Sequence, residues 1–151
     1  MSDVEGSCAC GAITLRVVDG FGENAKAVIC HCTDCQKAAG SLCSYWAPVL
    51  IEKLKIVKGQ PKTYRSPEGR SMSGKPVQRI FCGDCGTPLY AYPEGSVSGK
   101  FCVLLALFDN NLELGVEIFW RSAKGEIPPF DRRNVQDAIS LFQHGKAACT
   151  I

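Results

Sequence analysis

Seven of the ten cysteines in this 151-residue chain fall into three short clusters. These clusters are Cys8-Ala9-Cys10, Cys30-His31-Cys32-Thr33-Asp34-Cys35 and Cys82-Gly83-Asp84-Cys85. Four thiolates complete a tetrahedral zinc site, whereas three thiolates leave one position open for water or substrate. Seven clustered cysteines therefore predict one closed and one open Zn²⁺ site, in a fold that metal holds together.

The spacing of the cysteines favours metal binding over disulfide formation. Pairs separated by one or two residues form strained or reducible disulfide rings, but they suit metal-binding loops. The beginning of the chain, residues 1–5, has no basic start followed by an apolar run, so no secretory signal is expected. We therefore expect a cytoplasmic, reducing environment, in which paired cysteines bind metal or perform chemistry.

Length and composition indicate a single zinc-binding domain over residues 1–151. The hydrophobic fraction of 46% is ordinary for a globular protein. The net charge of +2 is too small to predict binding to nucleic acid or to a membrane surface. No segment approaches the ~20 apolar residues of a membrane span.

The hydrophobic pattern predicts a mainly β fold, built of short antiparallel strands with one or two short helices. Strands are expected around Ile13–Val17 and over 26–30, 43–47, 54–57, 62–65, 77–81, 89–92 and 101–107, and another with Val116, Ile118 and Trp120 on one face. A helix is expected over 33–39, with Thr33 and Gln36 forming a capping box and Gly40 ending it. Val135, Ala138, Ile139 and Phe142 have helical spacing and predict a second, amphipathic helix.

The closed site is expected at Cys82 and Cys85 together with Cys8 and Cys10. Gly83 and Gly86 allow the tight turn that points both sulfurs of the Cys82–Cys85 knuckle inward. One knuckle supplies two ligands, and the Cys8-x-Cys10 pair is its natural partner. The metal would connect the N-terminal segment to the middle of the sheet.

The open site is expected at Cys30, Cys32 and Cys35. Cys35 falls in the first turn of the predicted helix, where the helix dipole favours a thiolate. Cys43 or His31 could supply a fourth ligand, which would make this site structural. The remaining candidates are expected to lie elsewhere: Cys102 in the core, Cys149 in the C-terminal tail and His144 in solvent.

Several other residues could contribute to binding. Lys58, Lys62, Arg65, Arg70, Lys75 and Arg79 form a basic segment with a single acid, Glu68. This segment could bind a carboxylate or a nucleic-acid phosphate, or could be an ordinary solvated surface. Tyr45, Trp46, Tyr90 and Tyr92 could line a small pocket or pack in the core. Asp34 could act as a base, or could simply favour the start of the helix.

The three motifs, in the order CxCG, CHCxxCQ and FCxxCG, resemble those of the glutathione-dependent formaldehyde-activating family, which includes a centromere-associated branch. The resemblance extends over residues 8–90 and implies an Mss4-like, tent-shaped β fold. It also implies a structural zinc on Cys8, Cys10, Cys82 and Cys85, and a catalytic zinc on Cys30, Cys32 and Cys35. Family members are carbon–sulfur lyases that form S-hydroxymethylglutathione from glutathione and formaldehyde.

Three functional hypotheses follow. In the leading one, the protein is a zinc-dependent lyase-type enzyme that promotes addition of a small-molecule thiol to formaldehyde or another small aldehyde. In the second, the same fold is a binding module without catalysis, and it uses the basic segment. In the third, the cysteines of the open site form a redox switch.

Overall fold

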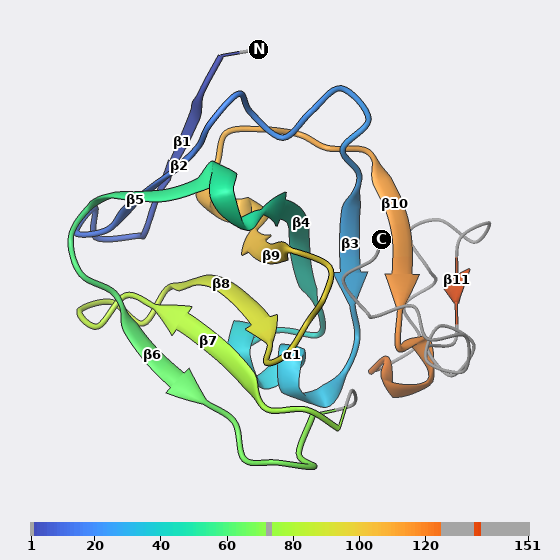
Figure 1. Cartoon of the computed structure of the whole chain (residues 1–151). Coiled ribbons are helices and arrows are strands. Elements are labelled where there is room, and N and C mark those ends of the chain that lie inside the picture. Colours follow the sequence, from blue (N-terminus) through green and yellow to red (C-terminus); the bar gives the residue numbers. More distant parts are fainter. Residues whose placement is uncertain (1, 72–73, 125–134, 137–151) are drawn as a thin grey trace.

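The structure, a computed structural model, describes residues 2–71 and 74–124 and the backbone of 135–136. The regular structure of the described residues consists of two β-sheets, one short α-helix, α1 (Thr33–Ala39), and three 3₁₀ turns, Ile51–Lys53, Leu105–Leu107 and Trp120–Ser122 (Figure 1). The smaller sheet has the order β1-β2-β5, with bounds Val4–Ser7, Thr14–Val17 and Leu54–Lys58. The larger sheet has the order β11-β10-β3-β4-β9-β8-β7-β6, with bounds Val135–Gln136, Leu114–Ile118, Ala27–Cys30, Ser44–Leu50, Lys100–Leu104, Pro88–Pro93, Val77–Phe81 and Lys62–Arg65. The predicted mainly β fold class is confirmed.

The larger sheet is mixed, although most of its strands are antiparallel neighbours as expected. β10 pairs in parallel with β3 and with β11. β3 therefore has a parallel neighbour on one side and the antiparallel strand β4 on the other. All four residues of β3 are buried because both faces of this central strand are covered.

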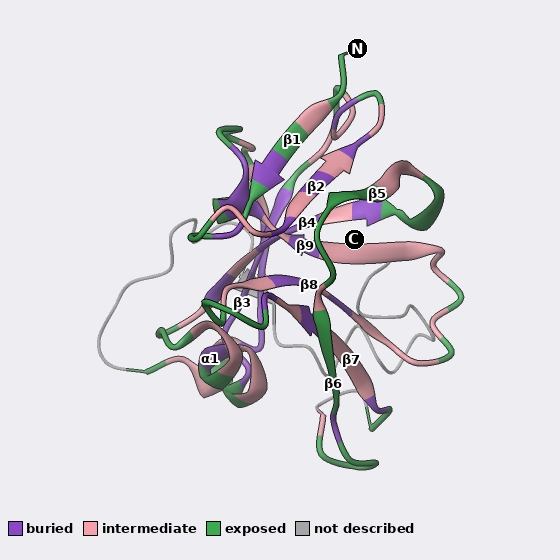
Figure 2. Ribbon diagram, turned by 90° about the vertical axis from the view of Figure 1, so that its left-hand side faces the viewer, coloured by how far each residue is buried: buried purple, intermediate pink, exposed green. Residues whose placement is uncertain are grey.

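Two apolar clusters cover alternate residues of the central strands. Ala27 belongs to the cluster that also contains Leu15 and Val17 of β2, so this cluster joins the two sheets. Val28 and Cys30 belong to the second cluster, together with Trp46 of β4. Figure 2 shows the buried residues gathered around the central strands, whereas the edge strand β6 is exposed along its length.

Helix α1 begins and ends where the sequence predicts, but its N-terminal cap differs. Cys32 is the N-cap, and its Sγ accepts a hydrogen bond from the backbone N–H of Cys35. The expected capping box of Thr33 with Gln36 is therefore wrong, because Thr33 already lies inside the helix. Gly40 ends the helix in the left-handed conformation, with φ 61°.

Two predicted strands are shorter than expected. β9 ends at Leu104, and Leu105–Leu107 form a 3₁₀ turn in which Phe108 N–H bonds to Leu105 O. β10 ends at Ile118 because Phe119 adopts a left-handed conformation with φ 57°. Trp120 therefore lies in the 3₁₀ turn Trp120–Ser122 and is not part of a strand face.

Strand β1 has no clear signal in the sequence. Its four residues include one large apolar side chain, Val4, which pairs with Val17 of β2. Gly6 packs so closely beneath Phe108 that a Cβ atom there would lie 2.7 Å from the carbonyl oxygen of Leu107. Tertiary contacts, more than local preference, therefore define this strand.

The amphipathic helix predicted around 135–142 falls mostly outside the described residues. Val135–Gln136 pair with β10 as β11, and the remainder of that prediction is not described. Within the described residues, no helix combines the length and the apolar character that a membrane crossing requires.

Leu89→Ala is expected to lower the free energy of unfolding by about 2–5 kcal/mol, because Leu89 is fully buried at the junction of the two sheets. Urea denaturation monitored by circular dichroism would measure the loss. The matched control is Leu42→Ala, since Leu42 is 48% exposed. Equal losses for the two variants would contradict the assignment of Leu89 to the core.

Candidate metal centres

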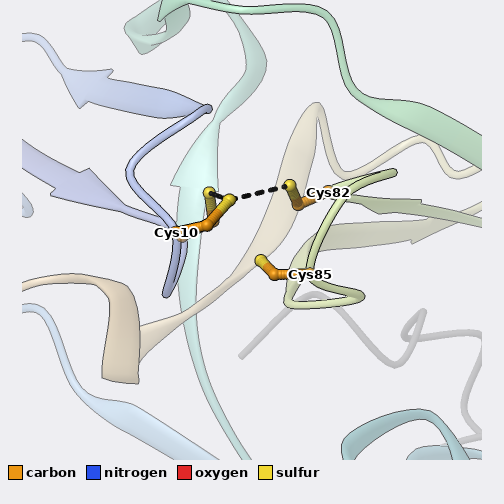
Figure 3. A group of neighbouring side chains, drawn as sticks. Cys10, Cys82 and Cys85 are labelled. Carbon is orange, nitrogen blue, oxygen red and sulfur yellow. Dashed lines mark hydrogen bonds between the residues drawn. The ribbon is translucent and has the colours of Figure 1, made fainter.

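The first group of cysteines joins two loops that are distant in the sequence. Cys8 and Cys10 lie between β1 and β2, and Cys82 and Cys85 lie between β7 and β8. Figure 3 shows that side chains from the two loops point toward one another. All four sulfurs lie within 4.8 Å of one another, so the structure assembles the four residues predicted for the closed site.

The spacing of these sulfurs fits zinc. Tetrahedral zinc with Zn–S bonds of ~2.3 Å places its sulfur ligands ~3.8 Å apart. The Sγ atoms of Cys8 and Cys10 are 3.6 Å apart, and those of Cys10 and Cys82 are 3.8 Å apart. A disulfide would need ~2.05 Å, so the arrangement matches metal ligands and not bonded cysteines.

Thr87 connects the two loops of the closed group, a role that the sequence analysis missed. Its hydroxyl accepts a hydrogen bond from the backbone N–H of Ala9 and lies 3.1 Å from the Sγ of Cys85. Hydrogen bonds from the Thr87 side chain and backbone lower the pKa of Cys85 to about 6. A threonine directly after a CxxCG motif is the only sequence signal for this contact.

The second group is the cysteine trio, Cys30, Cys32 and Cys35. Cys30 ends β3, Cys32 caps α1, and Cys35 lies in the first turn of that helix. The three sulfurs lie within 4.8 Å of one another, and among the described residues no other His, Cys, Asp or Glu side chain completes the group. The trio therefore has the three-ligand composition expected of an open site.

The thiols of the trio influence one another's ionisation. Hydrogen bonds with Cys32 and Cys35 raise the pKa of Cys30 well above its usual value, and burial adds to this effect. The pKa of Cys35 is held well below its usual value by hydrogen bonds from Cys30 and Cys32, against the effect of burial, and by the guanidinium of Arg79. A positive charge beside Cys35 favours its thiolate, and a bound cation would allow all three thiols to ionise.

His31 lies between two cysteines of the trio but does not join them. Its Nε2 is 2.9 Å from Oε2 of Glu117, which is fully buried in β10. The Nε2 amide of Gln36 donates to the carbonyl oxygen of His31, and the Trp120 ring packs edge-on against the imidazole. His31 is thus a packing residue behind the trio. Glu117, which the sequence analysis missed, is recognisable only as an acid within an apolar strand.

Cys43, the other possible fourth ligand, and the residues expected outside both sites are placed as follows. Cys43 is outside both sulfur groups, and its pKa is raised by burial and by the charge of Glu117. Cys102 lies in β9 and packs against the second apolar cluster. His144 and Cys149 fall outside the described residues.

A small pocket of about 150 Å³ is lined in part by Trp46 and Ala91, which share the second apolar cluster with Cys30 and Cys32 of the trio. Its lining includes Trp46 and Tyr90 of the four candidate aromatics, and Arg79 of the basic segment. The other two aromatics, Tyr45 and Tyr92, pack against the first cluster. Asp34 lies in the first turn of α1, as the sequence indicates.

Much of the basic segment is engaged within the protein. Arg65 forms two hydrogen bonds with the carboxylate of Glu94, at 2.7 and 2.8 Å. Lys58 donates to the carbonyl oxygen of Gly11 at 2.7 Å. These internal partners reduce the charge available to an external phosphate.

The chain resembles known proteins in both sequence and fold. Residues 3–122 match the family described as glutathione-dependent formaldehyde-activating enzyme. An uncharacterized lyase of Schizosaccharomyces pombe is 30% identical over 96 residues, which are 63% of this chain and 62% of the yeast protein. A crystal structure of a Rhodobacter sphaeroides protein superposes with a TM-score of 0.50 at 20% identity, covering 71% of this chain and 89% of that one. The latter likeness concerns the fold alone.

Cys82→Ser is expected to give largely insoluble or unfolded protein. A structural zinc contributes an apparent ~10–16 kcal/mol, as much as the ~5–15 kcal/mol net stability of a typical domain. Soluble yield, thermal melting and zinc content would measure the effect. Cys43→Ser, outside both groups, is the matched control. A folded Cys82→Ser variant with unchanged melting would disprove the closed site.

Glu117→Ala is expected to destabilise the fold by at least about 2 kcal/mol, because His31 would lose its buried partner. Glu117→Gln keeps a hydrogen-bonding group and should lose less. Chemical denaturation of the two variants would compare these losses. Equal stability of Glu117→Ala and the unmodified protein would show that the pair contributes nothing.

Proposed function

Because this chain belongs to the glutathione-dependent formaldehyde-activating enzyme family, we propose that it is a zinc-dependent carbon–sulfur lyase that adds a thiol to a small aldehyde at the cysteine trio. Glutathione is the thiol that the family description indicates. The lyase named in Schizosaccharomyces pombe supports the same reaction class. Two zinc ions are proposed, one at each group of sulfurs.

The observation that carries this proposal is the difference between the two groups. One holds four sulfurs and the other holds three, with no fourth side-chain ligand among the described residues. A closed group serves structure, whereas an open group leaves a position for a reactant. When bound, zinc supplies a positive charge that can ionise a thiol or polarise a carbonyl at neutral pH.

The residues around the trio hold it in place and limit access of water. Cys30 and Cys32 are both buried, and Trp46 and Phe119 pack in the same apolar cluster. The hydrogen bond from Cys35 N–H to Cys32 Sγ fixes the relative positions of these two side chains. A rigid, partly dry site favours reaction between two reactants that it holds in the correct orientation.

Cys32→Ser tests the open site without removing the helix cap. Serine is a preferred N-cap residue, so the hydrogen bond from Cys35 N–H can persist while the thiolate is lost. We expect zinc content to fall from two ions to one in a folded variant that no longer binds glutathione. Metal analysis, circular dichroism and calorimetric titration of glutathione, with and without formaldehyde, provide the measurements.

Two results would contradict the proposed function. If Cys32→Ser unfolds the protein, the trio is structural. If the unmodified protein holds one zinc and ignores thiols, catalysis at the trio is refuted. In either case the alternative of a binding module without catalysis would replace the present proposal.

A further inference from the structure

Building on the proposed addition of a thiol to an aldehyde, we propose that Arg79 binds a carboxylate on the carbonyl substrate. The preferred aldehyde would then be a small oxo acid, of which glyoxylate is the simplest, in place of formaldehyde. The pocket that Arg79 lines would hold this substrate, and the thiol would approach from outside the pocket.

Arg79 lines the pocket and also lies near the trio. It occupies the middle of β7, opposite Tyr64 of β6 and Ala91 of β8. Ala91 belongs to the same buried cluster as Cys30 and Cys32. The Arg79 guanidinium is close enough to Cys35 to lower the pKa of that thiol, so one side chain borders both the pocket and the trio.

The size of the pocket indicates which reactant it holds. A volume of about 150 Å³ accommodates roughly five water-sized groups. Glutathione, a tripeptide, is too large to be enclosed in this space, whereas a small aldehyde fits within it. A two-carbon aldehyde that carries a carboxylate is small enough for this volume, and the charge of the lining favours it over an uncharged aldehyde.

The lining of the pocket indicates the charge of the reactant. Trp46, Tyr64 and Tyr90 contribute apolar and aromatic surface, and of the described lining residues only Arg79 carries a charge. A guanidinium presents paired donors that match a carboxylate, which an uncharged aldehyde could not use.

A comparison with Arg65 on the neighbouring strand supports this reading. Arg65 forms ion pairs with Glu94 and Glu68. Among the described residues no carboxylate forms such a pair with Arg79. The guanidinium in the pocket therefore retains donors for an external anion.

The reaction itself is a balanced addition. The thiol sulfur attacks the aldehyde carbon, and one carbon–sulfur bond forms. The π electron pair of the carbonyl moves to its oxygen, which takes the proton that the thiol gives up. The carboxylate is unchanged and no electrons are exchanged with a redox partner.

The test compares glyoxylate with acetaldehyde, an uncharged aldehyde of similar length, in the presence of glutathione and the zinc-loaded protein. Exchange NMR measures adduct formation, and calorimetry measures binding of oxamate, an unreactive carboxylate analogue. We expect the unmodified protein to prefer glyoxylate and to bind oxamate.

Arg79→Gln should reduce the preference for glyoxylate and the affinity for oxamate by about 10- to 100-fold, as expected for loss of hydrogen bonds to a charged group. Arg79→Lys should restore part of both.

The control is Arg70→Gln, which makes the same change of charge at an exposed turn away from the pocket. Zinc content is measured for every variant, since Arg79 lies close to Cys35. If Arg79→Gln loses zinc, the question is decided by two other measurements. These are the comparison of the two aldehydes with the unmodified protein, and the same comparison with the Arg79→Lys variant.

The outcomes separate this inference from the proposed function. Equal use of the two aldehydes by the unmodified protein, or equal preference in the protein and its Arg79→Gln variant, would overturn the carboxylate site while leaving thiol addition intact. Binding of oxamate that depends on Arg79, without any adduct formation, would support the carboxylate site and refute the lyase.

Discussion

The rest of the structure depends on the contact between the two loops of the closed group, where four thiols meet. One loop belongs to the small sheet and the other to the large sheet. Cys8 and Cys82 are also buried members of the apolar cluster that joins the sheets. A metal bound there would therefore stabilise the same interface that hydrophobic packing forms, and the two effects would be lost together.

The cysteine trio depends on that framework through β3. Successive side chains of an extended segment point to opposite sides. Cys30 and Cys32 can therefore point to the same side as Cys35, while His31 points toward β10. The hydrogen bond between His31 and Glu117 anchors the intervening residue from behind. Because Cys32 also caps α1, the start of the helix and the position of its thiol are determined by the same contact. The trio is thus held from two sides before any ligand arrives.

Much of this arrangement could be predicted from the sequence because it is local. Cysteine spacing identified both groups of sulfurs, and the alternation of apolar residues over Ile13–Val17 located β2. The features that could not be predicted are set by tertiary contacts. β1 exists through its pairing with β2, and Phe119 ends β10 by adopting a left-handed conformation that its residue type does not indicate. Arg79 was visible only as one of several basic residues, since its position opposite Ala91 depends on strand register.

The thiols and most of the pocket wall come from different elements, although α1 contributes Cys35 to the trio and Ala38 to the wall, and this has an evolutionary consequence. The trio comes from β3 and α1, whereas Tyr64, Arg79 and Tyr90 come from β6, β7 and β8. Substitutions on these outer strands could change which molecule is accepted without altering the cysteines. A lineage built on this scaffold could therefore diversify its chemistry at the periphery while its sulfur framework stays the same.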